Sequence, residues 1–210
     1  MARVRATRAV ENATRRWGFW RIAGCDEVGR GCLAGPVVAG AVILDPDRRI
    51  AGLADSKLVP PDEREHLYER ITTTAFAWAV ASVSPGDIDR MNIHRASLEA
   101  MRQSVLALAP LPDVVLVDAF SIPRLLIAQR GIQKGDRRCS AIAAASIVAK
   151  VTRDRQMAKY HEDDPRYGYH RHKGYATPEH LAAVTRFGYS DLHRRSFRPA
   201  SLFGGADVIP

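Results

Sequence analysis

The segment Gly24-Cys-Asp-Glu-Val-Gly-Arg-Gly31 combines two acidic side chains with a glycine-rich turn. It lies between two apolar runs, so we expect Asp26 and Glu27 to lie at a strand end and the residues Gly29, Arg30 and Gly31 to form a turn. The carboxylates supply negative charge, while the turn amides and Arg30 can donate hydrogen bonds to phosphate and hydroxyl oxygens. This combination suits a metal site that holds a polyphosphate. An exposed acidic pair before a tight hairpin turn is the alternative for this segment alone.

Two more aspartates follow apolar runs later in the chain. Asp118 comes directly after 114–117, and Asp136 comes shortly after 127–132. Ligands of α/β sheets bind at the carboxyl ends of the strands, so we expect these carboxylates and the earlier pair to converge. Close together, they would raise one another's pKa unless cations neutralise them. Alternatively, Asp118 simply closes a strand and Asp136 caps a helix over 139–150.

Hard oxygen ligands of this kind suit Mg²⁺ or Mn²⁺. Two such ions roughly 4 Å apart can activate a water molecule and stabilise a leaving 3′ oxygen in an in-line displacement. The pattern of carboxylates therefore indicates a two-metal site for phosphodiester chemistry.

The composition fits one globular domain with at most a small appendage. Hydrophobic residues make up 46% of the 210 residues and charged residues 26%. The formal net charge of +8 favours a polyanionic partner such as nucleic acid, although an arginine-rich coding bias would produce the same excess.

The sequence contains no signal of a membrane protein. Its longest uncharged run, 71–86, is too short and too polar to span a bilayer, and the N-terminus lacks the apolar core of a signal peptide. Three cysteines form no metal-ligand pattern, and an odd number argues against a disulfide framework. We therefore expect a cytoplasmic protein with reduced, buried thiols, and nothing in the sequence requires more than a monomer.

The apolar patterns predict a mixed α/β sheet. They indicate strands over 17–26, 36–44, 75–84, 114–117 and 127–132, and helices over 6–17, 62–74, 93–108 and 140–160. The first two strands are too close in sequence for a crossover helix, so they should form a hairpin-like pair. The alternation that follows predicts a five-stranded sheet with helices on its faces, and the alanine-rich run from Ser140 would let its helix pack very close to the sheet.

Changes in charge along the sequence suggest how the chain is divided into segments. We expect a solvated arm or helix over 1–18, a catalytic domain over 19–160, a basic extension over 161–198 and a flexible tail over 199–210. Within the extension, residues 165–198 carry seven lysines and arginines against two acidic residues, and tyrosines 167, 169, 175 and 189 are interleaved with them.

Several motifs together resemble the ribonuclease HII family, in that family's order and over about residues 20–198. They are Gly24-Cys-Asp-Glu-Val-Gly-Arg-Gly31, Asp55-Ser-Lys57, Val117-Asp118, Lys134-Gly-Asp136, Ile142-Ala-Ala-Ala-Ser-Ile-Val-Ala-Lys-Val-Thr-Arg-Asp154, Lys173-Gly-Tyr175 with Thr177 and His180, and His193-Arg-Arg-Ser-Phe197. The resemblance implies an RNase H-like fold with a C-terminal helical extension. It also implies an Mg²⁺- or Mn²⁺-dependent endonuclease that cuts the RNA strand of RNA–DNA hybrids and single ribonucleotides in duplex DNA, as in ribonucleotide excision repair.

The resemblance assigns roles to particular positions. Asp26, Glu27, Asp118 and Asp136 match the four metal-binding carboxylates, and Gly29-Arg30-Gly31 matches the segment that contacts the 2′-hydroxyl and the backbone near the cut. The 2′-hydroxyl is what distinguishes RNA from DNA at a site, so the physical argument agrees. Tyr175 matches a tyrosine that packs on the sugar of the nucleotide after the ribonucleotide, although a tail tyrosine that covers the core is the simpler interpretation.

Basic residues and histidines leave more alternatives open. Lys57 and Lys150 match positions that face backbone phosphates, but a lysine at the solvent edge of a helix would look the same. Arg194 and Arg195 either contact phosphates or cap the tail. The histidines of the extension lack a zinc-binding spacing, so we expect surface or structural roles for them; they are His170, His172, His180 and His193.

The chain departs from the family pattern in two places. Ala119 and Phe120 follow the third carboxylate where the family usually has glycine, and an added methyl group there could shift the backbone. Arg137-Arg-Cys-Ser-Ala141 replaces the usual small and hydroxyl-bearing run, which puts a serine hydrogen bond in doubt and adds arginines for phosphate binding.

Other functions remain as alternatives. A type III ribonuclease H shares the chemistry but carries an N-terminal binding domain, for which about 20 residues before the first strand leave no room. A catalytically weak module that binds RNA–DNA hybrids on the same fold would be favoured by loss of a carboxylate. A resolvase or integrase-like nuclease would lack the Gly-Arg-Gly and Lys-Gly-Tyr elements. Association with a sliding clamp or an RNA polymerase stays open.

Overall fold

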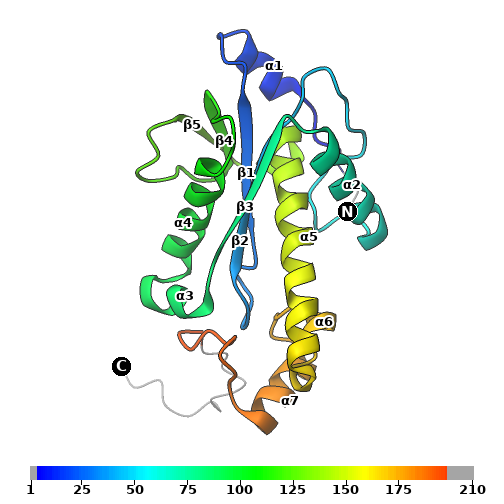
Figure 1. Ribbon diagram of the computed structural model, residues 1–210, viewed down its shortest axis with the longest axis vertical. Coiled ribbons are helices and arrows are strands. Elements are labelled where there is room, and N and C mark those ends of the chain that lie inside the picture. The colour runs from blue at the N-terminus through cyan, green and yellow to red at the C-terminus, as the bar shows by residue number, and fades with distance from the viewer. Residues whose placement is uncertain (1–3, 198–210) are drawn as a thin grey trace.

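A five-stranded mixed sheet forms the centre of the computed structural model, which describes residues 4–197 (Figure 1). The strand order is β3-β2-β1-β4-β5, with antiparallel pairs β1–β2 and β2–β3 and parallel pairs β1–β4 and β4–β5. The strands are β1 Ile22–Val28, β2 Val37–Ile43, β3 Ala77–Val83, β4 Val114–Asp118 and β5 Ala128–Ile132. The predicted hairpin-like pair and the five-stranded α/β sheet are confirmed.

Helices cover both faces of this sheet. In Figure 1, α5 and α2 lie on one side of the strands and α3 and α4 on the other. Two separate apolar clusters match these layers, one between the sheet and α5 with α2, the other between the sheet and α4. The helices are α1 Ala9–Arg15, α2 Pro61–Thr74, α3 Pro85–Met91, α4 Ile93–Leu106, α5 Ser140–Asp163, α6 Tyr169–His172 and α7 Pro178–Phe187.

Helix α5 packs unusually close to β1. A Cβ atom at Gly24 would come within 2.0 Å of the backbone carbonyl carbon of Ala141, so only glycine fits there. The first turns of α5 are rich in alanine and fully buried, which allows the helix backbone to approach the strand. The predicted close packing of this helix is therefore confirmed, and it holds α5 beside the strand that carries Asp26.

Two residues of the N-terminal segment bind the body of the protein, although many of its other residues are exposed. Glu11 of α1 is 1% exposed, and its Oε1 accepts a hydrogen bond from the backbone N–H of Ala141 at 2.8 Å. The guanidinium of Arg8 donates to the backbone carbonyls of Asp45, Pro46 and Arg48. Glu11 thus satisfies a donor at the start of α5, where an acidic group is favoured. Helix α1 lies within the helix predicted over 6–17, and the division of the chain at residue 18 stays a prediction.

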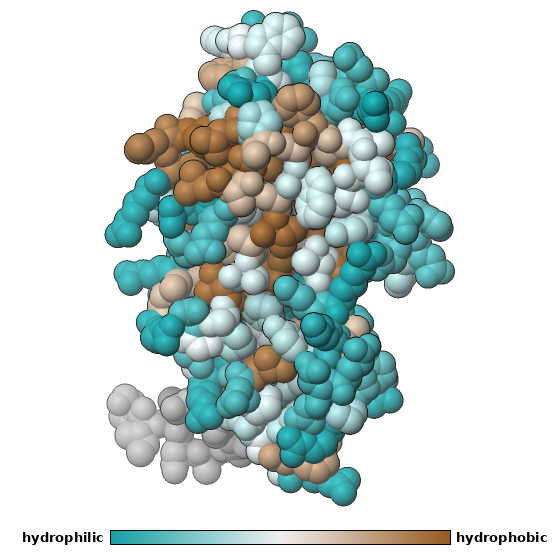
Figure 2. Space-filling model, viewed as in Figure 1, coloured by the Kyte–Doolittle hydropathy of each residue, from teal (hydrophilic) through white to brown (hydrophobic). Residues whose placement is uncertain are grey.

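The C-terminal extension folds against the far end of α5. A 3₁₀ turn, Pro165–Tyr167, leads into α6 and α7, and a third apolar cluster joins them to Leu33 and Met157. The surface around the lower part of α5 and around α6 is mostly hydrophilic (Figure 2). Cys25, Cys32 and Cys139 are free and buried, as predicted, while the tail predicted over 199–210 lies outside the described residues. Across residues 4–197, no helix has the length and apolarity needed to span a membrane.

Candidate active site

The four predicted carboxylates come from neighbouring parts of the sheet. Asp26 and Glu27 lie near the C-terminal end of β1, and Asp118 is the final residue of β4. Asp136 lies in a 3₁₀ turn, Gly135–Arg137, after β5. Because β1, β4 and β5 are parallel neighbours, their carboxyl ends meet at one edge of the sheet. Asp136 does not cap α5, whose N-cap residue is Cys139, so that alternative is wrong.

Mutual repulsion and burial define the electrostatics of this edge. Burial raises the pKa of Asp26, which is 6% exposed, and the charges of Glu27 and Asp118 raise it further. Burial also raises the pKa of Glu27, although the paired guanidinium of Arg30 lowers it, with Nη1 to Oε1 at 3.2 Å. Asp26, Glu27 and Asp118 therefore lie close enough together for the negative charge of one to disfavour ionisation of another.

The other two carboxylates behave in the same way. Burial raises the pKa of Asp118, against a hydrogen bond from the Gly135 N–H to its Oδ1 at 2.7 Å. Burial, together with the charges of Asp55 and Asp118, raises the pKa of Asp136 to about 6. The four predicted side chains are thus electrostatically coupled through Asp118.

A fifth carboxylate, Asp55, belongs to the same neighbourhood. It is 5% exposed, and its Oδ2 accepts a hydrogen bond from Arg137 Nη2 at 3.0 Å. Its negative charge raises the pKa of both Asp118 and Asp136. The Asp55-Ser-Lys57 motif is part of the resemblance, but from the sequence we assigned a site role only to its lysine. Arg137, one of the departures from the family pattern, is engaged by this carboxylate.

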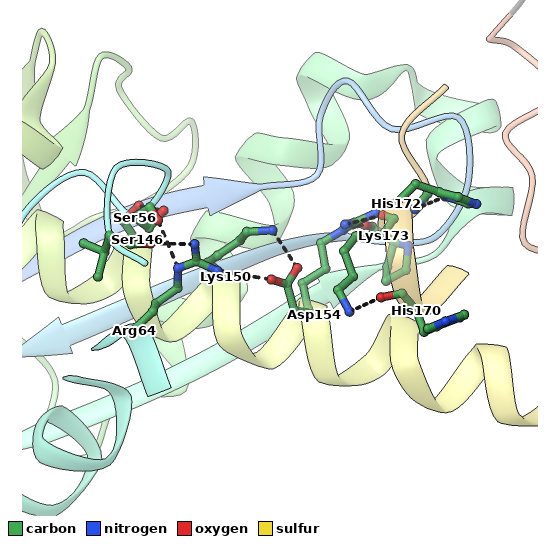
Figure 3. Close-up of polar contacts among 12 residues, drawn as sticks. Ser56, Arg64, Ser146, Lys150, Asp154, His170, His172 and Lys173 are labelled. Carbon is green, nitrogen blue, oxygen red and sulfur yellow. Dashed lines mark hydrogen bonds and ion pairs between the residues drawn. The ribbon is translucent and has the colours of Figure 1, made fainter. Parts of the chain in front are cut away.

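Two serines connect this motif to α5. The Ser146 hydroxyl donates to Ser56 Oγ at 2.9 Å (Figure 3), and it also lies beside Asp26, whose charged form it favours. From the sequence we did not identify Ser146 as a site residue, because it lies within an alanine-rich run that we interpreted as the face of a helix packed against the sheet.

The two predicted phosphate-binding lysines differ in environment. Lys57 is exposed, and its charge lowers the pKa of Asp118 and Asp136, so it lies near the carboxylates. The Lys150 side chain is 12% exposed and donates to Asp154 Oδ1 at 2.6 Å, while Arg64 pairs with the other oxygen at 3.4 Å (Figure 3). Lys150 is therefore held in an ion-pair network on α5, and its phosphate contact stays a prediction.

Tyr175 lies beside the segment that follows the Gly-Arg-Gly turn. The carbonyl of Gly174 accepts hydrogen bonds from the N–H groups of Leu33 and Ala34 at 2.8 and 3.2 Å. Burial raises the pKa of Tyr175, as does its neighbour Cys32, yet the side chain remains 39% exposed. The fold thus brings the Lys-Gly-Tyr motif and the Gly-Arg-Gly turn together and leaves a tyrosine face accessible.

The tail arginines have separate roles. Arg194 is fully buried and donates only to backbone carbonyls, so the alternative of a phosphate contact is wrong for it. Arg195 is exposed, and its backbone N–H donates to Asp89 Oδ2 at 2.8 Å.

The buried histidines of the extension are structural. The Nε2 atoms of His180 and His193 lie 3.1 Å apart, His172 stacks on His180, and burial lowers the pKa of His180 and His193 to about 4. The sequence-based expectation of surface or structural roles is consistent with these contacts.

Ala119 adopts a backbone conformation that favours glycine. Its φ angle is +59°, in the left-handed region where a Cβ atom is disfavoured. Ala119 is therefore a strained residue directly after Asp118, while the backbone shift expected from its methyl group stays a prediction.

The donor set fits hard divalent cations. In the described part of the chain, no group of three or more His, Cys, Asp and Glu side chains is already arranged as a metal site. The carboxylates nevertheless offer only oxygen donors with raised pKa values, and Glu27 Oε2 is buried without a hydrogen-bond partner. A cation at this edge would satisfy that oxygen and offset the repulsion.

Comparison with known proteins identifies the family. A family model described as Ribonuclease HII matches residues 23–200. A ribonuclease HII of Geobacillus thermodenitrificans is 54% identical over 182 residues, covering 87% of this chain and 70% of the relative. The solved ribonuclease H2 of Pyrococcus horikoshii matches with a TM-score of 0.72 and 26% identity, covering 85% of this chain and 94% of that one. A PCNA:RNase HII complex from Archaeoglobus fulgidus contains a chain that matches with a TM-score of 0.72 and 27% identity, covering 86% of this chain and 96% of that one. The protein described here is therefore an enzyme, a hydrolase that belongs to the ribonuclease HII family.

Proposed function

We propose that this enzyme is an endonuclease that hydrolyses the RNA strand of RNA–DNA hybrids and cuts on the 5′ side of single ribonucleotides in duplex DNA. The products would carry 3′-hydroxyl and 5′-phosphate ends. The observation that carries the proposal is the convergence of Asp26, Glu27, Asp118 and Asp136 beside the Gly-Arg-Gly turn. A carboxylate cluster supports phosphodiester chemistry, and the adjacent turn supports recognition of the sugar that follows the cut.

The four carboxylates would hold two divalent ions, Mg²⁺ or Mn²⁺. When bound, such ions lower the pKa of a water molecule and stabilise negative charge on the leaving 3′ oxygen. The carboxylates of this chain are suited to that task because burial raises the pKa of Asp26 and Asp118, and a bound cation would offset the cost of their negative charge. Asp55 would take no direct part, since its carboxylate already pairs with Arg137 and orders the turn that carries Asp136.

Recognition of the ribonucleotide would fall to the turn and to Tyr175. Arg30 is held near the carboxylates by its ion pair with Glu27, and the backbone N–H groups of the turn are donors suited to a 2′-hydroxyl or a phosphate oxygen. The exposed face of Tyr175 would pack on the sugar of the next nucleotide, where an additional 2′-hydroxyl is disfavoured. This arrangement would favour a junction from RNA to DNA.

Charge supports the same class of partner. The net charge of +8 favours a polyanion, and binding through phosphates should weaken steeply with salt because counterions are released. The PCNA complex of the Archaeoglobus fulgidus protein supports a further proposal, that a sliding clamp delivers this enzyme to DNA.

The decisive experiment uses two duplexes that differ by one ribonucleotide in one strand. With Mg²⁺ or Mn²⁺, the protein should cut the ribonucleotide-containing duplex on its 5′ side and leave the all-DNA duplex whole. Cleavage of a long hybrid without cleavage at the single ribonucleotide would refute junction recognition and direct attention to Ala119 and the altered segment after Asp136. Binding without cleavage of either substrate would favour the alternative of a catalytically weak hybrid-binding module.

A further inference from the structure

Two arginines are completely buried next to the Gly-Arg-Gly turn. Arg153 of α5 and Arg194 of the extension are both 0% exposed. Buried cations are usually paired with carboxylates, because an unpaired charge costs much free energy away from water. Neither of these arginines forms an ion pair with any residue in 4–197, and every hydrogen bond of their guanidinium groups goes to a backbone carbonyl.

Arg194 is bonded directly to the turn. Its Nη2 donates to the carbonyl of Gly29 at 2.6 Å, and its Nη1 donates to the carbonyl of Arg30 at 2.8 Å. Its Nε donates to the carbonyl of Gly35 at 3.0 Å, which anchors the group on the following segment. One planar guanidinium therefore fixes the orientation of two consecutive peptide units of the turn.

That orientation decides where the amides of the turn point. In a planar trans peptide the C=O and N–H bonds point in opposite directions. The carbonyls of Gly29 and Arg30 face Arg194, so the N–H groups of Arg30 and Gly31 face away from it. Within residues 4–197 neither N–H has an acceptor, and Gly31 is exposed. Two consecutive free N–H groups on one side of a turn form a small binding site for an oxygen anion or hydroxyl.

Arg153 supports the turn from a second side. Gly29 has a φ angle of +90°, and a Cβ atom there would lie 2.3 Å from Arg153 Nε, so the arginine occupies the space of the missing side chain. Its Nη1 donates to the carbonyl of Lys173 at 2.8 Å, next to the segment that carries Tyr175. The two buried arginines thus join the turn to the Lys-Gly-Tyr motif.

We propose that Arg194 is a positioning residue for ribose recognition, which holds the Gly-Arg-Gly turn so that the N–H groups of Arg30 and Gly31 face the ribonucleotide. The inference rests on the proposed function and adds a contribution from the C-terminal extension to the discrimination of RNA from DNA. Arg194 touches no substrate in this arrangement, and it acts through the backbone of the turn.

The test is Arg194→Lys, with Arg195→Lys as its matched control. Lysine keeps the charge, but its ammonium group cannot present a planar fork to three carbonyls. Dissociation constants are measured without divalent metal for two duplexes that differ by a single 2′-hydroxyl group. We expect Arg194→Lys to reduce the preference for the ribonucleotide-containing duplex by about fivefold or more, corresponding to about 1 kcal/mol, with little change for the all-DNA duplex. Arg195→Lys should preserve the preference.

The outcomes separate this inference from the proposed function. An unchanged preference in Arg194→Lys, or equal weakening of both duplexes, overturns the positioning role while the wild type still discriminates. A wild type that ignores the 2′-hydroxyl in both binding and cleavage overturns the proposed function and this inference with it. If Arg194→Lys does not fold, the backbone amide NMR resonances of the wild-type protein provide the test. The resonances of Arg30 and Gly31 should shift when the ribonucleotide-containing duplex is added and not when the all-DNA duplex is added. Identical spectra with the two duplexes would refute the inference.

Discussion

The guanidinium carbon of Arg30 lies 5.1 Å from the centre of the Phe120 ring, while Nη1 of the same side chain donates to Glu27. A residue of the turn after β1 is thereby held between a carboxylate of the candidate metal site and the loop after β4. Phe120 belongs to one of the departures from the family pattern, and its ring restricts Arg30 before any substrate arrives.

Replacing Phe120 by leucine should therefore weaken substrate binding modestly. A cation–π contact at a partly exposed site is worth about 0.5–1 kcal/mol, so we expect KM for a ribonucleotide-containing duplex to rise about two- to fivefold with little change in kcat. Steady-state cleavage measures both constants. Phe76→Leu is the control, since Phe76 is 55% exposed just before β3. An unchanged KM in Phe120→Leu would show that the contact does not order Arg30.

Asp118→Asn should abolish cleavage and leave the fold intact. The asparagine oxygen can still accept the hydrogen bond from the Gly135 N–H, but the charge that would bind metal is lost. Burial raises the pKa of Asp118, which means that its negative charge destabilises the folded state. Removing that charge should therefore leave the midpoint of thermal unfolding unchanged or higher. Cleavage assays and thermal unfolding test both parts, with Asp62→Asn, an exposed position in α2, as the control. Retained cleavage would refute the assignment.

Ala119→Gly should stabilise the protein. The φ angle of +59° strains an alanine, and glycine removes that strain at some cost in unfolded-state entropy, so we expect a net gain of about 0.5–1 kcal/mol. Denaturant unfolding measures the difference. Ala75→Gly is the matched control: its φ angle is −64°, so the same change should destabilise. A loss of stability in both variants would mean that Ala119 is not strained.

Tyr175→Ala should reduce discrimination more than it reduces binding. The exposed face of this ring is available to a sugar, whereas contacts of the backbone hold the segment in place without it. We expect cleavage at a single embedded ribonucleotide to fall while binding to plain duplex DNA changes little. Parallel measurements on both substrates are needed, and equal losses on the two would assign Tyr175 a purely structural role.

Glu11→Ala should destabilise the protein, although α1 contains none of the predicted active-site residues. The substitution leaves the buried N–H of Ala141 without an acceptor, which typically costs about 1–3 kcal/mol. Asn12→Ala changes an exposed residue of the same helix and should cost much less. Thermal or denaturant unfolding compares the two variants, and similar losses would contradict a specific role of Glu11 at the start of α5.

Local patterns in the sequence determined most of the fold and part of the site. The apolar patterns predicted every strand of the sheet, although β1 begins at Ile22 rather than at residue 17 and runs on to Val28. The positions of Asp26, Asp118 and Asp136 after apolar runs predicted that they share one edge. These inferences succeed because strand ends and helix starts depend on nearby residues, and because parallel neighbours must bring their carboxyl ends together.

Only the tertiary structure decided how residues far apart in the chain pair. Arg194 could equally have faced phosphates or the protein, and its burial under the Gly-Arg-Gly turn depends on how the extension folds back over a separation of 165 residues. The pairing of Lys150 with Asp154, the approach of Asp55 to the carboxylates and the contact of Glu11 with α5 have the same origin. A charged side chain is equally compatible with solvent, a phosphate or a buried partner, and the surrounding packing alone selects among them.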